Sequence, residues 1–183
     1  MRIIAGTRRR LRLKTLEGKD VRPTTDRIKE TLFNMIQMEV PGCYFLDLFA
    51  GSGQIGLEAA SRGAKYVVFA EHAKSAADCI RNNIAVTDFQ KETLLCQRDV
   101  ISALSSLEGK YQFDIIFMDP PYGKLEEKEV FAYLQNSSLL KEDTLIITEA
   151  ALKTDFSYLN EMGFEIVREK KYKTNAHIFV KRF

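Results

Sequence analysis

Cysteine and histidine are scarce in this chain of 183 residues, which contains only three cysteines and two histidines. Cys43, Cys79 and Cys96 lie far apart, so none of them forms the CxxC pair that is typical of zinc and redox sites. Their odd number does not suit a disulfide framework either. With only His72 and His177 to complete a ligand set, we expect reduced, mostly buried thiols and no bound metal.

Long apolar segments are also missing. The sequence has no run of about eighteen apolar residues, which is the length that a transmembrane helix needs. Its first fourteen residues are rich in arginine where a signal peptide has an apolar stretch. We therefore expect a cytoplasmic protein that has no membrane partner.

Proline and glycine are few as well. Four prolines and ten glycines exclude a fibrous or disordered class, and 45% hydrophobic with 28% charged residues is ordinary for a soluble globular protein. A chain of this length suits a single hydrophobic core.

Positive charge is concentrated in the first part of the chain. Residues 1–30 carry ten basic and four acidic side chains, an excess of six, although the whole chain has a net charge of only +2. The other 153 residues therefore carry a net charge of −4. A basic arm on a mildly acidic body suits the binding of phosphates, although a solvated surface segment has the same composition.

Short apolar runs alternate with helical patterns from residue 44 onward, which predicts βα units and a mostly parallel sheet with helices on both faces. We expect parallel strands at residues 44–48, 66–70, 92–97, 114–118 and 144–149. Helices are expected at residues 54–61, 74–86, 100–107 and 126–135. A short helix at 156–161 then precedes two β-rich runs, 164–169 and 177–181, which indicate an antiparallel hairpin at one edge. Proline and capping residues at 22–26, followed by apolar residues at helical spacing, predict a further helix before the first strand.

A glycine-rich motif, G-x-G-x-x-G, follows the first expected strand within residues 47–56. Glycines at such a turn let the backbone approach a ligand closely, and the free N–H groups of the helix start face that ligand. Glu71 ends the second strand, where a carboxylate can accept both hydroxyls of a ribose. The motif therefore predicts NAD or S-adenosylmethionine as cofactor, although a glycine turn without a ligand has the same pattern.

Acidic residues favour S-adenosylmethionine over NAD. Asp47 lies four residues before Gly51 and could hold the ammonium of a methionine moiety, whereas it would repel a pyrophosphate. Asp99 follows the third strand, and open parallel sheets bind ligands beyond the carboxyl ends of their strands. A helix cap is the alternative role for an aspartate in that place. The residues that we expect to contact the cofactor are Asp47, Phe49, Gly51, Ser52, Gly53, Glu71, Asp99 and Val100.

Asp119, Pro120, Pro121 and Tyr122 follow the fourth expected strand without a break. Successive prolines remove two backbone donors, so this turn presents carbonyl oxygens and a carboxylate. If Asp119 and the Pro120 carbonyl each accept one N–H of an exocyclic amine, the nitrogen lone pair is aimed at the methyl donor. Tyr122 can stack on a base that has left its helix. We expect these four residues to form the catalytic centre of an amine methyltransferase, the alternative being a rigid turn.

The sequence resembles the bacterial small-subunit ribosomal RNA methyltransferase D family, which makes N2-methylguanine in 16S rRNA. The match covers nearly the whole chain, including residues 2–6, 46–53, 56–59 and 61–64. Its specific element is Arg-Pro-Thr-Thr-Asp-Arg at residues 22–27, since many amino-methyltransferases share the cofactor loop and the Asp-Pro-Pro-Tyr turn. Gln54 and residues 172–175 depart from the family pattern, but neither change removes a group that the chemistry needs.

The resemblance implies an α/β, Rossmann-like class I fold for S-adenosylmethionine-dependent methyltransferases. Its seven-stranded sheet would be mostly parallel, with an antiparallel C-terminal strand and a basic N-terminal extension. We divide the chain into residues 1–40, the basic arm and helix, and residues 41–183, the methyltransferase domain. The implied partner is 16S rRNA or the small ribosomal subunit, and we expect a monomer. The residues expected to contact RNA are Arg8, Arg9, Arg10, Arg12, Arg22, Thr25 and Arg27.

Three other interpretations remain open. The Asp-Pro-Pro-Tyr turn also fits methylation of adenine N6 in DNA or of an amine in another RNA. An NAD-dependent oxidoreductase would explain the glycine motif and Glu71, but it would leave Asp119 and Tyr122 without a role. A non-catalytic RNA-binding factor would have no need of these two residues.

Overall fold

The structure is a computed structural model that describes all residues except 17–25, 122 and 124. In this part of the chain, seven strands form one sheet of order β3-β2-β1-β4-β5-β7-β6. The strands are β1 (Tyr44–Leu48), β2 (Tyr66–Ala70), β3 (Thr93–Cys96), β4 (Phe113–Met118), β5 (Leu140–Ala151), β6 (Phe164–Lys171) and β7 (Asn175–Arg182). The helices are α1 (Asp26–Met35), α2 (Gln54–Ser61), α3 (Lys74–Thr87), α4 (Val100–Leu107), α5 (Glu126–Leu134) and α6 (Tyr158–Glu161).

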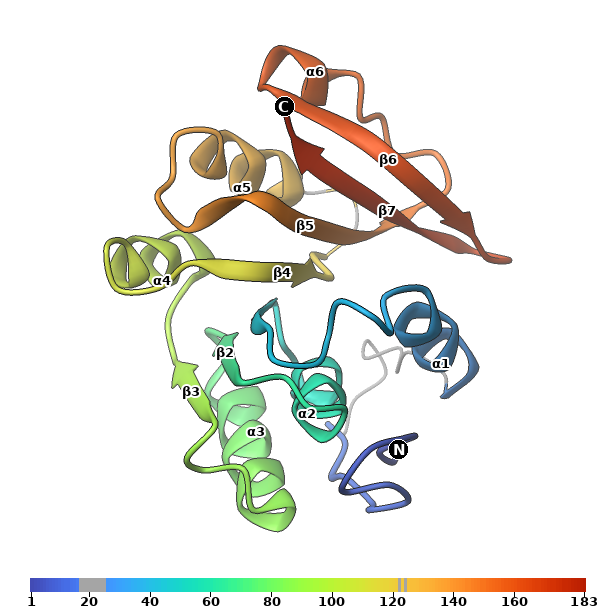
Figure 1. The fold of residues 1–183 in the computed structure, drawn as a ribbon, viewed down its shortest axis with the longest axis vertical. Helices are drawn as coiled ribbons and strands as arrows, with labels where there is room; N and C mark the ends of the chain where they lie inside the picture. Colours follow the sequence, from blue (N-terminus) through green and yellow to red (C-terminus); the bar gives the residue numbers. More distant parts are fainter. Residues whose placement is uncertain (17–25, 122, 124) are drawn as a thin grey trace.

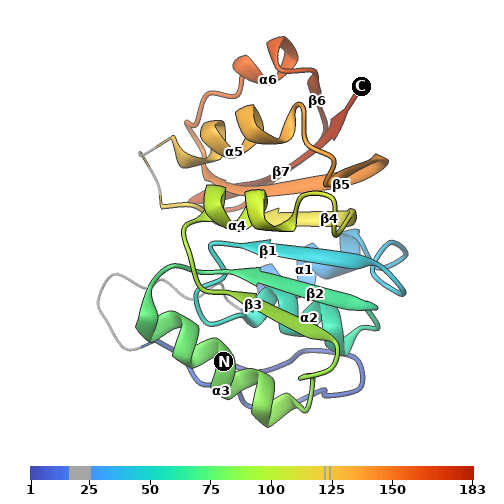
Figure 2. The same cartoon turned by 90° about the vertical axis from the view of Figure 1, so that its left-hand side faces the viewer.

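The first five strands are parallel, and the last two add an antiparallel edge. β5 pairs antiparallel with β7, which in turn pairs antiparallel with β6. Figure 2 shows β3, β2, β1, β4 and β5 stacked in this order, with the C-terminal strands beyond β5. The expected sheet, with its antiparallel C-terminal end, is therefore confirmed.

Side chains alternate between two buried faces along each central strand, as the period of a β-strand requires. Phe45, Phe69 and Phe117 point to the face that α1, α2 and α3 cover. Leu46 and Met118 point to the opposite face, under α4, α5 and α6. Both faces are thus covered by helices, which is why the strands read as nearly continuous apolar runs.

Expected and observed element bounds differ most at β5, which begins at Leu140 instead of residue 144. The pairing of β4 with β5 is interrupted by a bulge, where the N–H of Lys141 donates to the Thr144 hydroxyl at 2.7 Å. Residues 141–143 are all charged, so the first part of this strand lacks the apolar pattern that predicts a buried strand. The three cysteines are free, with Cys43 and Cys79 buried, as expected.

None of the helices in the described part of the chain has the length and apolar character needed to cross a membrane.

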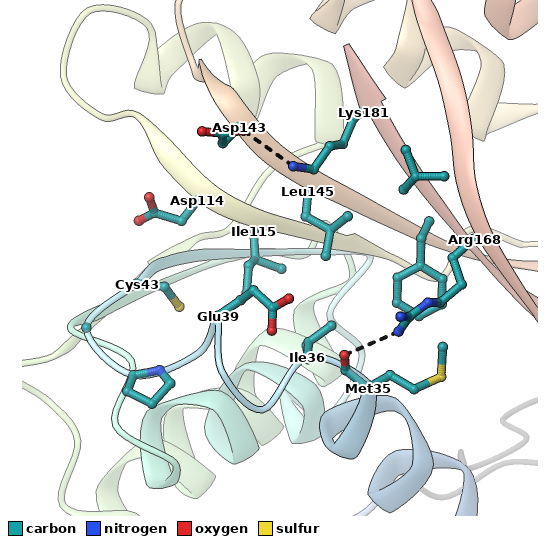
Figure 3. A pocket seen from close by; sticks show the side chains of 14 residues that line it. Met35, Ile36, Glu39, Cys43, Asp114, Ile115, Asp143, Leu145, Arg168 and Lys181 are labelled. Carbon is teal, nitrogen blue, oxygen red and sulfur yellow. Dashed lines mark hydrogen bonds and ion pairs between the residues drawn. The ribbon is translucent and has the colours of Figure 1, made fainter. Parts of the chain in front are cut away.

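A cavity of about 510 Å³ lies between the end of α1 and the neighbouring face of β4, β5, β6 and β7 (Figure 3). Arg168 reaches across it toward the carbonyl of Met35 at 3.5 Å, and Lys181 pairs with Asp143 at 3.4 Å. Asp114 lines it near the beginning of β4. The cavity is therefore at the amino ends of the parallel strands, whereas the sequence predicts the catalytic residues at their carboxyl ends.

The N-terminal segment, residues 1–16, lies against α2 and α3 (Figure 1). Arg2 and Arg12 form an antiparallel bridge, so the segment folds back on itself as a small hairpin. Ile3 and Leu13 are buried in the same core as α1 and α2. These basic residues therefore belong to a segment that is held on the domain by its own apolar side chains.

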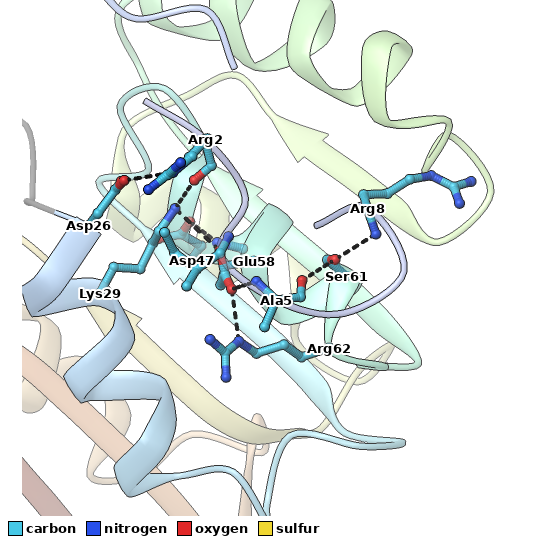
Figure 4. Close-up of polar contacts among 11 residues, drawn as sticks. Arg2, Ala5, Arg8, Asp26, Lys29, Asp47, Glu58, Ser61 and Arg62 are labelled. Atoms are coloured by element: carbon cyan, nitrogen blue, oxygen red, sulfur yellow. Dashed lines mark hydrogen bonds and ion pairs between the residues drawn. The ribbon is translucent and has the colours of Figure 1, made fainter. Parts of the chain in front are cut away.

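Glu58 in α2 connects this segment to the rest of the fold (Figure 4). Its carboxylate accepts hydrogen bonds from the backbone N–H groups of Ile4 at 2.8 Å and Ala5 at 3.0 Å. It also pairs with Lys29 of α1 at 3.3 Å and with Arg62 at 2.8 Å. Glu58 and Lys29 are both fully buried, so two buried charges compensate each other.

Lys29 is one of the ten basic residues of the first thirty, but it does not face the solvent. Its ammonium donates to the carbonyl of Arg2 at 2.6 Å in addition to its contact with Glu58. Burial lowers the pKa of Lys29, and the charge of Glu58 opposes that change. The surface of the segment is thus less basic than a count of its residues suggests.

We predict that Glu58→Gln lowers the free energy of unfolding by about 3 kcal/mol, because Lys29 then loses its buried counter-charge. Urea denaturation followed by circular dichroism measures this loss. Asp78→Asn is the matched control, because Asp78 forms an exposed ion pair with Arg81, and its loss should cost less than about 0.5 kcal/mol. Equal losses for the two variants would contradict the prediction.

Candidate active site

The backbone after β1 turns through three residues with positive φ angles. Phe49, Gly51 and Gly53 have φ values of 57°, 56° and 75°. Gly53 directly precedes α2, so the first N–H groups of the helix follow the turn. Gly56 is required for another reason, because a Cβ there would lie 2.3 Å from the ring of Phe69. The helix start therefore sits in close contact with β2.

Asp47 lies under this turn, one residue before the end of β1. Its carboxylate accepts the N–H of Gly56 at 2.8 Å, and only 2% of the residue is exposed. Burial raises the pKa of Asp47 well above its usual range, and the negative charges of Asp119 and Glu71 raise it further. A cation bound at this point would relieve these unfavourable interactions, so the environment of Asp47 fits the ammonium group expected there.

Glu71 follows β2 and holds the same turn from the other side. Its carboxylate accepts the N–H of Gly51 at 2.9 Å and the N–H of Ala73 at 2.8 Å. These bonds fix both oxygens at the edge of the sheet, while each oxygen retains a lone pair for a further donor. Glu71 is therefore oriented in a way that suits the expected contact with ribose hydroxyls.

A second cavity, of about 480 Å³, opens beside the glycine turn. Phe49, Asp99 and Val100, which the sequence assigns to cofactor binding, line it together with His72 and the beginning of α5. Asp99 is also the N-cap of α4, since its side chain accepts the N–H of Ser102 at 2.9 Å. The capping role considered from the sequence is therefore present, and the same residue lines the cavity.

Asn83 of α3 connects the glycine turn, residues 49–53, to the N-terminal segment. Its side-chain amide donates to the carbonyl of Ser52 at 2.9 Å and to the carbonyl of Lys14 at 3.0 Å. Its oxygen accepts the N–H of Lys14 at 2.7 Å. Asn83 is 1% exposed, so these bonds are shielded from water. The backbone carbonyl of Ser52 is thus the group of the turn that Asn83 binds.

Asp119 follows directly after β4, at the same edge of the sheet as Asp47 and Glu71. Burial raises the pKa of Asp119 to about 8, and the negative charge of Glu149 on β5 adds to the effect. Pro120 is buried and Pro121 is exposed. Tyr122, expected to stack on a base, lies outside the described residues.

The residues expected to contact RNA fall into three groups. Arg9, Arg10, Arg12 and Arg27 are exposed. Arg8 is partly buried, because its guanidinium donates to the carbonyl of Thr87 at 2.7 Å and lies 5.3 Å from the ring centre of Phe89. Arg8 therefore helps to hold the segment on α3. Arg22 and Thr25 lie outside the described residues.

Glu149 and His177 were not among the site residues predicted from the sequence. Glu149 is near the end of β5, just as Asp119 follows β4, so the rule that found four strand-end carboxylates could have found this fifth one. His177 is on β7, which runs in the opposite direction, and no spacing in the sequence connects it to the site. Within residues 1–16, 26–121, 123 and 125–183, no cluster of residues could hold a metal ion.

Solved structures support the architecture. One from Escherichia coli and one from Thermus thermophilus both give a TM-score of 0.84, at 29% and 27% sequence identity. The first comparison covers 100% of this chain and 97% of the other, and the second covers 99% of each. The sheet order and the acidic edge together define a class I, Rossmann-like fold of S-adenosylmethionine-dependent methyltransferases.

A protein family described as "Conserved hypothetical protein 95" matches residues 1–181. Ribosomal RNA small subunit methyltransferase D of Haemophilus influenzae is 33% identical over 171 residues, which cover 93% of this chain and 88% of that protein. The protein of the same name from Escherichia coli K12 is 32% identical over 154 residues, covering 84% and 76%. The chain belongs to this family, the ribosomal RNA small subunit methyltransferase D family.

We predict that Asp47→Asn weakens binding of S-adenosylmethionine at least about tenfold while leaving the fold as stable or more stable. The pKa of Asp47 is higher in the folded than in the unfolded chain, so its ionisation costs stability as the pH rises above the unfolded value. Asparagine avoids that cost at neutral pH and can still accept the N–H of Gly56. Calorimetric titration and thermal unfolding measure the two effects.

The matched control for this variant is Asp114→Asn, at the amino end of β4. Asp114 accepts the N–H of Tyr44 at 2.8 Å, so this change is also made in the sheet, but far from the glycine turn. We expect the affinity for the cofactor to stay unchanged in the control. Unchanged affinity in Asp47→Asn would remove Asp47 from the cofactor site.

Proposed function

We propose that this protein transfers a methyl group from S-adenosylmethionine to the exocyclic N2 of a guanine in small-subunit ribosomal RNA. The observation that carries the proposal is the position of Asp119 and Pro120 at the same sheet edge as Asp47 and Glu71. The named relatives from Haemophilus influenzae and Escherichia coli support the choice of ribosomal RNA. We further propose that the protein acts as a monomer, in the cytoplasm, on 16S rRNA or an assembling small subunit.

Asp47 and Glu71 would hold the two ends of the cofactor, and Phe49, Asp99 and Val100 would line the space between them. The bound cofactor supplies the methyl group. A carboxylate at the ammonium and another at the ribose fix its orientation at the edge of the sheet. The acidic surroundings suit a ligand that carries a sulfonium and an ammonium and has no phosphate.

Asp119 and the carbonyl of Pro120 would each accept one N–H of the target amine. In guanine the lone pair of this nitrogen is delocalised into the ring, so the amine is a poor nucleophile. Two acceptors that hold both hydrogens direct the lone pair toward the methyl group. The ionised form of Asp119 is the better acceptor, and its pKa of about 8 means that this form is about half populated at pH 8 in the free protein and becomes dominant as the pH rises further.

The exposed arginines of the N-terminal segment would contact RNA phosphates. Lys14 is joined through Asn83 to Ser52 of the cofactor turn, so the segment approaches the same edge of the sheet. We propose residues 1–40 as the part that binds RNA and residues 41–183 as the part that performs methyl transfer. The charge of the segment suits any nucleic acid, so the position of Asp119 carries the choice of reaction.

We predict that the protein incorporates labelled methyl from S-adenosylmethionine into unmethylated small ribosomal subunits and that nucleoside analysis finds N2-methylguanosine. Asp119→Ala should lower the rate at least about 100-fold, the typical cost of removing one positioned hydrogen-bonding group from a transition state. The assay is best run above pH 8, where Asp119 is ionised.

Asp143→Ala serves as the control for Asp119→Ala, because Asp143 is a highly exposed aspartate at the other end of the neighbouring strand. Both variants should bind S-adenosylhomocysteine like the unchanged protein. Label found only in N6-methyladenine would overturn the proposed substrate, and full activity of Asp119→Ala would overturn the proposed centre.

We also predict that replacing Arg9, Arg10 and Arg12 together by alanine weakens RNA binding and flattens its salt dependence. For each lost phosphate contact, the slope of log affinity against log salt should fall by about 0.7 to 0.9. Filter binding at several salt concentrations measures the slope. Lys110→Ala, an exposed change after α4, should leave it unchanged. An unaltered slope in the triple variant would place the RNA elsewhere.

A further inference from the structure

A row of polar residues continues from Asp119 across the C-terminal strands. Met118 is opposite Thr148 in the pairing of β4 with β5, so Asp119 comes next to Glu149. Glu149 is in turn opposite His177 on β7. By the alternation of side chains along their strands, all three point to the face that α1 and α2 cover. Glu149 therefore stands beside the catalytic turn in a fixed register.

Hydrogen bonds fix the carboxylate of Glu149, and the residue is only 6% exposed. One oxygen accepts the side-chain amide N–H of Asn175, and the other lies 3.2 Å from Nε2 of His177. Nδ1 of His177 lies 3.1 Å from the hydroxyl of Tyr172, and its ring meets the edge of Phe117 with ring centres 6.0 Å apart. The carboxylate is thus held in place by two side chains of β7.

The direction of these bonds keeps Glu149 an acceptor. Burial and the charge of Glu149 raise the pKa of Tyr172 to about 12, so its hydroxyl remains protonated and donates to Nδ1 of His177. When Nδ1 accepts that hydrogen, the ring N–H that faces Glu149 is Nε2–H, which donates to the carboxylate. The opposite tautomer would set a nitrogen lone pair against a carboxylate. Glu149 consequently acts as a hydrogen-bond acceptor toward its neighbours.

Several hydrogen-bond acceptors are close to Glu149 along the chain or in the sheet. They are the carboxylate of Asp119, which follows β4 beside Glu149, the backbone carbonyl of the next residue, Pro120, and the side-chain oxygen of Asn175, whose amide bonds Glu149. That oxygen is buried and has no hydrogen-bond partner among the described residues. The amide nitrogen of Asn175 is already bonded to Glu149. A ligand that satisfies these acceptors must offer several hydrogen-bond donors side by side.

Guanine and adenine differ in this respect. Beside its amino group at C2, guanine has a hydrogen on N1, so two neighbouring nitrogens offer three N–H donors. Adenine has a lone pair on N1 beside its amino group at C6. A fixed carboxylate next to the acceptor of the amine would bind the guanine edge and repel the adenine edge.

We propose that Glu149 is the residue that selects guanine, by accepting the N1–H of the base while Asp119 and Pro120 hold its amino group. The inference rests on the proposed function, since it assigns the base recognised at the same site. Asn175 and His177 act as positioning residues that keep Glu149 in place. Asp119 interacts electrostatically with Glu149, and Asp47 with Asp119. The N–H hydrogens of the base would offset the repulsion between these carboxylates.

The test compares two small subunits reconstituted with 16S rRNA. One carries guanine at the position that the unchanged protein methylates, and the other carries 2-aminopurine there. This analogue keeps the amino group at C2 but has a lone pair in place of the N1 hydrogen, and it also lacks the oxygen at C6. We expect the unchanged protein to methylate 2-aminopurine at least about 100-fold more slowly, because the buried carboxylate then meets a lone pair.

Glu149→Gln should reduce the ratio of the guanine rate to the 2-aminopurine rate to about tenfold or less. An amide can accept from guanine N1–H or donate to N1 of 2-aminopurine. Glu142→Gln is the matched control, because Glu142 is an exposed residue of the same strand, and its ratio should equal that of the unchanged protein. Taking the ratio within each variant cancels any general loss of activity.

The outcomes separate the two proposals. Absence of N2-methylguanosine on the guanine subunits would overturn the proposed function itself. Equal rates of the unchanged protein on guanine and 2-aminopurine would overturn the role of Glu149 alone, and so would an unchanged ratio in folded Glu149→Gln. The comparison with the unchanged protein can therefore overturn the role of Glu149 even if the variant does not fold.

Discussion

Glu58 accepts two backbone N–H groups from the N-terminal segment and pairs with Lys29 and Arg62, so three parts of the fold meet at one buried carboxylate. Such a carboxylate is stable only when it is fully satisfied, which makes the arrangement specific as well as strong. Because α2 begins directly after Gly53, the helix that follows the glycine turn is also the one that holds the N-terminal segment. The position of the segment and the shape of the turn therefore depend on the same contact.

The chemistry of the site follows from negative charge gathered at one edge of a parallel sheet. Four different strands carry or are followed by one acidic residue each: Asp47, Glu71, Asp119 and Glu149. Their burial reduces the screening of these charges by water. An environment of this kind stabilises cations and hydrogen-bond donors and disfavours phosphate groups. A sulfonium cofactor and an amino group of a base are both of the favoured kind. Cofactor choice and substrate choice thus have one electrostatic origin.

The sequence predicted the fold well where apolar runs end abruptly. β1, β2, α2 and α4 have the bounds that their patterns indicated, because glycine or aspartate follows or precedes each of them closely. Prediction was weaker where charged residues extend a strand, as at the start of β5, or where an apparent surface charge is buried, as with Lys29. Glu149 and His177 meet only through antiparallel pairing of distant segments, and local patterns contain no information about such contacts.

The docking of residues 1–16 has a consequence for how the chain reaches its fold. The segment is made on the ribosome before its partners, yet it bonds to Glu58, Ser61, Asn83 and Thr87. The chain must be complete through Thr87 before the last of these contacts can form, because the bond from Arg8 to Thr87 spans 79 residues. Contacts of such large sequence separation form late, because their loop-closure entropy is lost before the contact is made. During synthesis, this segment is made before its partners and is therefore among the last parts to reach its final position, and its apolar side chains stay exposed until α2 and α3 have folded.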